Sequence, residues 1–143
     1  MQAGAMQHKF HFTASRFNAT EVRDYFINDC CFGDDVIAWL CERMSQTAAD
    51  ADIGEPIQED WGWGFWLELG DDRYWIYASV VPEEGGKDAR HEWLVGIDGH
   101  EPLFAWRRDM RTRRLARFDG FVTMLRTIVA SDAGNILVGE EDD

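Results

Sequence analysis

The sequence has only three cysteines, Cys30, Cys31 and Cys41, which cannot all pair with one another within the chain. Two of them are adjacent, and adjacent cysteines are a poor start for a disulfide framework. We therefore expect reduced thiols and a cytoplasmic location. The sequence also lacks an apolar run near the roughly 18 residues of a membrane span, and it begins without the charged region and apolar core of a signal peptide.

Basic residues are scarce relative to acidic ones. The chain has 14 Lys and Arg against 27 Asp and Glu, which gives a formal net charge of −13. Phosphate backbones and anionic lipid headgroups repel such a charge, so we expect no nucleic-acid partner and no membrane partner. Aromatic residues are abundant instead, at 13% with seven Trp, and the 45% hydrophobic content predicts a folded domain rather than a disordered chain.

The length of 143 residues suits a single domain, 1–143, whose ends at 1–7 and 139–143 we expect to be frayed. Apolar residues spaced at about 100° predict two helices, over 33–48 and 115–129. Alternating or short apolar runs predict strands over 9–14, 22–27, 92–97, 103–106 and 136–138, beside a hairpin over 61–81. This order predicts an α+β fold: one two-layer domain with a largely antiparallel sheet of about five strands and two helices packed on one face.

The predicted hairpin over 61–81 consists of two alternating runs on either side of a Gly-Asp-Asp-Arg turn at 70–73. A two-residue loop at 71–72 would pair Leu67 with Ile76. Alternation then turns one face of both strands towards the core. Between the sheet and both helices we expect one core made of Val36, Leu40, Met44, Phe65, Leu67, Ile76, Phe118, Val122 and Leu125.

The other face of this hairpin is aromatic, because the same alternation places Trp66, Trp75 and Tyr77 there. Each such side chain buries roughly 150–250 Å², so the three approach or exceed the few hundred Å² of apolar patch that a soluble monomer leaves exposed. Two interpretations stay open: a binding surface, or a second small core covered by the N-terminal strand region, residues 82–90 or the acidic tail. Trp39 lies off the apolar stripe of the first helix, so we count it as a fourth candidate for binding.

Arginines are concentrated at the start of the second predicted helix, at Arg107, Arg108, Arg111, Arg113, Arg114 and Arg117. Each cation near a helix N-terminus costs about 0.3–1 kcal/mol against the helix dipole, so helix formation alone does not explain these residues. Arg111 and Arg114 continue the apolar stripe backwards, which points them towards the sheet. We expect Arg107, Arg111 and Arg114 to form salt bridges with carboxylates of residues 1–106 or to bind an anion.

Other patterns that carry chemistry are weak. Cys30 and Cys31 precede a predicted helix N-terminus, where the pKa of a thiol is lowered, so they are candidates for reactive thiols. Paired carboxylates have ordinary explanations in helix starts, turns and loops. No spacing of His, Cys, Asp or Glu is diagnostic of a metal site, and we expect no catalytic residue, no metal and no cofactor.

No motif fixes a reaction. The negative charge and the aromatic face favour a non-enzymatic protein-binding module, of an inhibitor or toxin-neutralising type, whose partner has a basic surface. Two alternatives stay open. One is a small-ligand-binding protein or enzyme with an aromatic pocket and an arginine anion clamp, and the other is a domain that forms a homodimer through the aromatic face.

Overall fold

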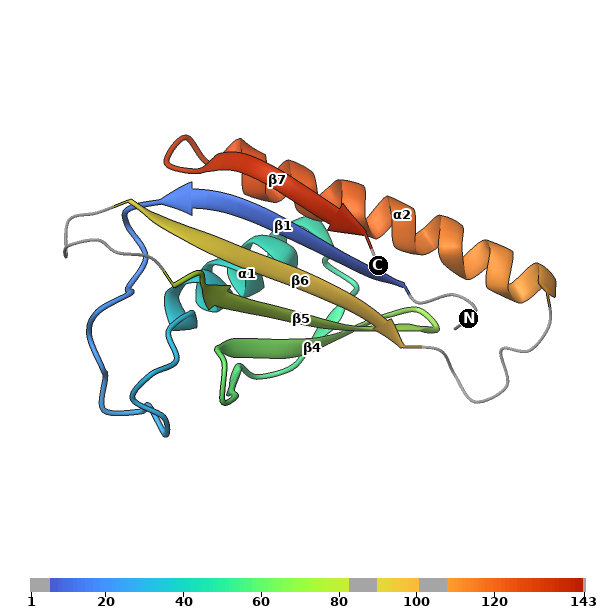
Figure 1. The fold of residues 1–143 in the computed structure, drawn as a ribbon. Coiled ribbons are helices and arrows are strands. Elements are labelled where there is room, and N and C mark those ends of the chain that lie inside the picture. Colours follow the sequence, from blue (N-terminus) through green and yellow to red (C-terminus); the bar gives the residue numbers. More distant parts are fainter. Residues whose placement is uncertain (1–5, 83–89, 101–107, 143) are drawn as a thin grey trace.

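The computed structural model describes residues 6–82, 90–100 and 108–142. Within these residues the chain forms seven strands and two helices (Figure 1). In chain order they are β1 (Gln7–Ala14), α1 (Asp34–Thr47), β2 (Asp52–Ile53), β3 (Ile57–Gln58), β4 (Trp63–Leu69), β5 (Asp72–Val80), β6 (His91–His100), α2 (Arg108–Ser131) and β7 (Ile136–Asp142).

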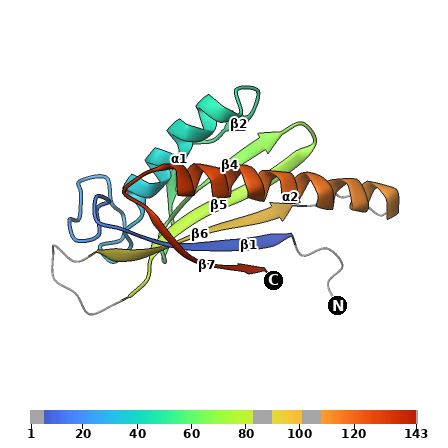
Figure 2. The same cartoon turned by 90° about the horizontal axis from the view of Figure 1, so that it is seen from above.

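All strand pairs are antiparallel, and the strands lie in the order β2-β4-β5-β6-β1-β7, with β3 also paired to β4. Both helices lie on one face of this sheet, so that Figure 1 looks onto the other, helix-free face, and Figure 2 shows the same arrangement from above. The predicted single-domain α+β fold is confirmed. The sheet has more strands than expected because β2 and β3, of two residues each, form where the sequence predicts a loop.

The core lies between the helices and the sheet. Alternate residues of β1, β4 and β5 point into it: on β1, Phe10 and Phe12 are fully buried, whereas His11 between them is only half-buried. This is the separation of faces that a period of two produces in a half-exposed strand. All the residues predicted to share one core do so: Val36, Leu40, Met44, Phe65, Leu67, Ile76, Phe118, Val122 and Leu125.

The hairpin of β4 and β5 turns one residue earlier than predicted. Leu67 pairs with Tyr74 rather than with Ile76, and Leu69 pairs with Asp72, so the two-residue loop is 70–71. Gly70, the first loop residue, has a φ of 62°, and a positive φ at this position is the feature of a type II′ turn that favours glycine. The predicted register is therefore wrong by two residues. Because the shift is even, every side chain keeps its predicted face.

The segment before α1 contains turns and bends, so the predicted strand over 22–27 is wrong. Side chains attach this segment to the first turn of the helix. The guanidinium of Arg23 donates hydrogen bonds to Asp34 at 2.8 Å and to Asp35 at 2.5 Å, and the hydroxyl of Tyr25 donates to Asp34. Asp34 and Asp35, which begin the helix, thus hold the preceding loop against its first turn. These contacts outweigh the strand preference of residues 22–27.

The two ends of the chain differ from expectation. The sequence predicts fraying at 1–7 and 139–143, whereas Gln7 begins β1 and 139–142 belong to β7, which pairs with β1. The strand predicted over 103–106 lies outside the described residues.

Strand β7 is attached to β1 through histidines as well as through backbone hydrogen bonds. The two ring nitrogens of His8 contact carboxylate oxygens of Glu140, at 2.8 Å, and of Asp142. On the other face His11 contacts Glu141 at 2.6 Å. Side-chain contacts of His8 and His11 therefore fasten this edge strand in addition to its backbone pairing.

Candidate functional site

Three large aromatic side chains lie on the helix-free face of the sheet, near the middle of the β4–β5 hairpin. Trp66 pairs with Trp75 across the two strands, and Tyr77 follows two residues later on β5. Their sequence neighbours Phe65 and Ile76 are fully buried on the helix side. The same two strands thus carry an apolar inner face and an aromatic outer face.

Glycines on the neighbouring strands make room for two of these rings. A Cβ at Gly64 on β4 would lie 2.4 Å from the ring of Trp75, and a Cβ at Gly96 on β6 would lie 2.0 Å from the ring of Tyr77. A side chain at either position would collide with the ring, so both rings lie against the sheet above these glycines. Within the alternation of Trp and Gly at 61–64, Gly64 therefore serves the packing of an indole.

The rings lie in two contacting groups along the hairpin. The ring centroids of Trp66 and Trp75 are 5.0 Å apart, and that of Trp61, just before β4, is 5.2 Å from Tyr77. His100, at the end of β6, lies 4.8 Å from Trp66. Tilted and edge-to-face pairs of this kind contribute about 0.5–1.5 kcal/mol beyond the area they bury. We call Trp61, Trp66, Trp75, Tyr77 and His100 the aromatic row.

The aromatic row is accessible in the described structure. Trp66, Trp75 and Tyr77 are half-buried by the sheet and by one another, and Trp61 is 45% exposed. Both helices lie on the opposite face (Figures 1 and 2). Of the segments that the sequence offers as covers, the N-terminal strand and the acidic tail are strands β1 and β7 of the sheet itself, and residues 83–89 lie outside the described residues.

One end of the row already holds a cation. The guanidinium carbon of Arg73 lies 3.9 Å from the centroid of the Trp66 ring, and its Nε is 3.8 Å from a carboxylate oxygen of Glu68. The negative face of an indole attracts cations, by about 0.5–1 kcal/mol at an exposed site and more where water is excluded. The row can therefore receive positively charged side chains.

An acidic group lies beside the centre of the row. Asp98 on β6 pairs in register with Trp75. Burial raises the pKa of the Asp98 carboxyl, by more than the nearby charges of His100 and Lys9 lower it. A carboxylate that has lost part of its hydration in this way gains from a cation brought to it by a partner.

Trp39, the fourth candidate from the sequence, lies apart from the row. It is on α1, on the helix side of the sheet, where its ring packs against Phe17 at 5.6 Å between centroids. The guanidinium of Arg16 lies over both rings, at 4.0 Å from the Phe17 centroid and 5.3 Å from that of Trp39. The structure therefore does not bring Trp39 together with Trp66, Trp75 and Tyr77.

The arginines of α2 make an internal ion pair. Asp72, at the start of β5, accepts hydrogen bonds from Arg114 at 3.5 Å and from Arg117 at 2.6 Å. Burial acts to raise the pKa of the Asp72 carboxyl, but the hydrogen bonds and charges of Arg117 and Arg114 outweigh it, so the pKa is lowered. Arg114 thus has the first of the two roles expected for it. Arg111 is half-buried on the same helix, and Arg107 lies outside the described residues.

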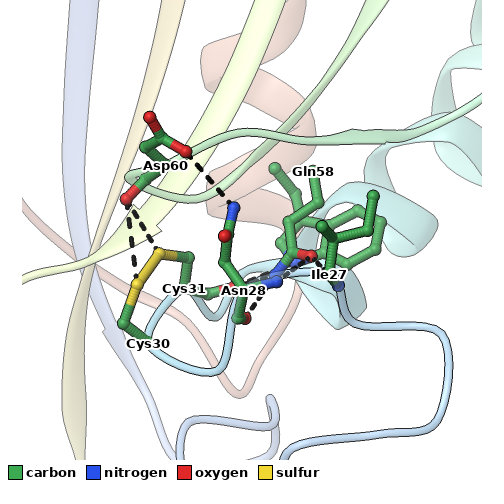
Figure 3. Close-up of a disulfide and its surroundings, with 7 residues drawn as sticks. Ile27, Asn28, Cys30, Cys31, Gln58 and Asp60 are labelled. Atoms are coloured by element: carbon green, nitrogen blue, oxygen red, sulfur yellow. Dashed lines mark hydrogen bonds between the residues drawn. A yellow bond between two sulfur atoms is a disulfide. The ribbon is translucent and has the colours of Figure 1, made fainter.

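The adjacent cysteines are not free thiols. Cys30 and Cys31 form a disulfide with each other in the loop before α1 (Figure 3). Adjacency prevents a framework that spans long loops, but it does not prevent a bond between neighbours at a turn, so our expectation of two reduced thiols was wrong. Neither sulfur titrates while this bond is intact. Cys41 is free and half-buried, and burial raises the pKa of its thiol to about 11.

The described residues contain no group of three or more His, Cys, Asp or Glu side chains that could hold a metal ion. Neither helix in this part of the chain is long and apolar enough to cross a membrane. No protein family, curated protein or solved structure matches the chain.

Sequence reasoning missed several members of the site. Trp61 begins the predicted hairpin, but in the structure it precedes β4, so the alternation of the strand does not extend to it, and its contact with Tyr77 depends on the hairpin register. His100 and Asp98 come from β6, whose pairing with β5 is not encoded locally. The one usable signal is Gly96, because a glycine within a strand indicates close approach of another group.

Proposed function

We propose that this chain is a non-enzymatic protein-binding module that holds a partner with a basic surface on its aromatic row. The observation that carries this proposal is the helix-free face itself, on which Trp66, Trp75 and Tyr77 are half-exposed. Aromatic side chains of this kind are the commonest anchors in interfaces, because they bury a large area at little cost in conformational entropy. An inhibitor or a toxin-neutralising protein uses its surface in this way.

The chemistry of the row favours a cationic partner. Arg73 shows that the indole of Trp66 accepts a guanidinium, and Asp98 supplies a partly dehydrated carboxylate beside Trp75. The net charge of −13 attracts a basic surface over a longer range and speeds the encounter. Lys and Arg side chains of the partner would then lie on the indoles and against Asp98.

The two alternative functions have less support. An anion clamp would use Arg111 or Arg114, and Arg114 already pairs with Asp72. A homodimer through the aromatic row would bring two chains of net charge −13 together, and like charges oppose this association. A cytoplasmic location remains part of the proposal, and fractionation of the native host cells tests it.

The test is the double variant Trp66→Ser/Trp75→Ser, with Ile27→Ser as the matched control. Ile27 is an apolar residue in the loop before α1 that is 82% exposed. The wild-type chain first captures its partner from a native-host extract, and calorimetry then measures the affinity of the identified pair. Loss of two anchors should weaken binding by about 30-fold or more, because each contributes on the order of 1–2 kcal/mol. Ile27→Ser should bind like the wild type.

The melting temperature and the molecular mass in solution decide whether the aromatic row is a binding surface, a covered second core or a homodimer interface. A binding surface predicts that the melting temperature of the double variant falls by no more than about 10 °C, the cost of the lost ring contacts, whereas a covered second core predicts a loss of more than about 20 °C. Added salt should weaken the complex, because the attraction is electrostatic. A wild-type dimer that the double variant abolishes would assign the row to a second copy and contradict the proposed partner.

A further inference from the structure

The disulfide between Cys30 and Cys31 contributes little to the stability of the fold. A disulfide stabilises mainly by removing conformations from the unfolded chain, and this effect grows with the length of the loop it closes. The two cysteines are neighbours, so their bond closes no loop of intervening residues. A structural role as a cross-link therefore does not explain the bond.

The two sulfur atoms differ in their access to solvent. Cys30 is exposed, whereas Cys31 is only 4% exposed. In thiol–disulfide exchange an incoming thiolate attacks one sulfur and the other sulfur leaves, and access decides which is attacked. The structure therefore makes Cys30 the sulfur that is attacked and Cys31 the sulfur that leaves.

A hollow of about 500 Å³ lies next to the disulfide and is lined by both cysteines. Its walls include the apolar side chains of Trp61, Val80 and Pro82 and the polar residue Thr20. Small-molecule sites in proteins have volumes of about 300–1,000 Å³ and combine apolar walls with a few polar groups. A thiol of the size of a tripeptide fits such a space.

Gln58 fixes the backbone on both sides of the disulfide (Figure 3). Its side-chain amide donates to the carbonyl oxygens of Asn28, at 2.8 Å, and of Cys31, at 3.2 Å. Its side-chain oxygen accepts from the backbone N–H groups of Ile27, at 2.5 Å, and of Asn28, at 3.0 Å. These four hydrogen bonds do not involve the sulfur atoms, so they persist when the disulfide opens.

The surroundings of Cys31 suit a thiol as well as a disulfide. The indole N–H of Trp63 donates to the carbonyl oxygen of Cys31 at 3.0 Å and holds this residue in place. The carbonyl oxygen of Asp60 lies 2.9 Å from Sγ of Cys31 and 3.8 Å from Sγ of Cys30 (Figure 3). A disulfide sulfur carries no proton to share with this oxygen, whereas a reduced Cys31 thiol can donate to it.

We propose that Cys30–Cys31 is a redox site that oxidises a small thiol bound in this hollow. The thiolate of the ligand attacks Sγ of Cys30, a mixed disulfide forms, and Cys31 leaves as a thiolate that takes up a proton. A second thiolate attacks the ligand sulfur of the mixed disulfide, which releases the oxidised ligand and leaves Cys30 to take up a proton. In sum, two thiols lose two electrons and two protons, and the pair gains both. Trp61 belongs both to the wall of this hollow and to the aromatic row, but the redox proposal does not rest on binding at the row.

The first measurement uses the wild-type chain and reduced glutathione as the probe. The folded protein is equilibrated with graded ratios of reduced and oxidised glutathione, alkylated, and weighed by mass spectrometry. We expect two thiols to appear together, at Cys30 and Cys31, and to disappear again when the ratio is reversed. The melting temperature should change by less than about 2 °C on reduction, because no loop is released.

The second measurement separates the roles of the two sulfur atoms, in a Cys41→Ser background. With oxidised glutathione, Cys31→Ser should take up one glutathione on Cys30, while Cys30→Ser should react at least tenfold more slowly, because its remaining thiol is buried. Equal rates in the two variants would overturn the assignment.

Two results with the wild-type chain would overturn the redox site without any variant. One is a disulfide that excess reduced glutathione opens only after the chain is unfolded. The other is a fall of more than about 5 °C in the melting temperature on reduction, which would make the bond a structural cross-link.

Discussion

Replacing Asp72 with Asn should break the ion pair that joins α2 to β5. The side chains of Asp72 and Arg114 are each 5% exposed, whereas that of Arg117 is 48% exposed. Asn keeps the shape of Asp but removes its charge, so the buried guanidinium of Arg114 loses its counter-charge. Removing one partner of a buried ion pair costs about 3–5 kcal/mol of unfolding free energy.

Urea unfolding followed by circular dichroism measures this loss, and two variants serve as controls. At about 4 °C per kcal/mol for a chain of this length, the melting temperature of Asp72→Asn should fall by about 12–20 °C. Arg117→Gln should cost only about 1 kcal/mol, because solvent screens a half-exposed partner. Arg73→Gln, which removes an exposed contact with Glu68, should cost less than about 0.5 kcal/mol.

The effect of Asp72→Asn should also depend on pH. Because the folded-state pKa of Asp72 is lowered, its charge stabilises the fold above the ordinary Asp value of about 3.9, and this contribution is lost as the pH falls through the lowered folded value. The unfolding free energies of the wild type and the variant should therefore differ by the full amount at neutral pH and become equal in acid. A loss below about 1 kcal/mol at neutral pH, or a difference that persists into acid, would refute the buried ion pair.

Two further predictions concern the sheet. Gly96→Ala should displace the ring of Tyr77 and change the near-ultraviolet circular dichroism, whereas Gly139→Ala, where an added Cβ meets nothing within 4 Å, should leave the spectrum unchanged. The pKa of Glu140 is lowered, first by its hydrogen bond from Arg126, so its stabilising effect is present above the ordinary Glu value of about 4.3 and is lost in acid. As the pH is lowered past that value, the amide protection factors in β7 should therefore decrease before those in β5 do. An equal decrease of the protection factors in both strands would contradict the role of Glu140.

The inner face of the sheet was predictable because it depends only on local spacing. Phe65 and Ile76 are buried in any register that keeps the parity of the strands. The register itself was not predictable, because two-residue loops beginning at Gly70 or at Asp71 both follow from the same turn sequence. The structure has the loop that places the positive φ on glycine.

The candidate site was predictable only where alternation reaches it. Trp66, Trp75 and Tyr77 follow from the parity of the hairpin, but His100 joins them through the pairing of β6 with β5, which is a long-range choice. The loop before α1 shows another limit, since the carboxylate of Asp34, outside the segment, decides its conformation. Local spacing of residues does not predict contacts between side chains that are distant in sequence.

The edges of the sheet limit how copies of this molecule can meet at high concentration. At one edge, β7 carries Glu140, Glu141 and Asp142, so two copies approaching edge to edge would bring rows of carboxylates together. At the other edge, β2 and β3 have two residues each, with Pro56 between them, and offer little backbone for a further strand. Charged, short and proline-interrupted edges are poor templates for strand addition. The protein should therefore resist growth into fibres, while the broad face of its sheet stays available for contact.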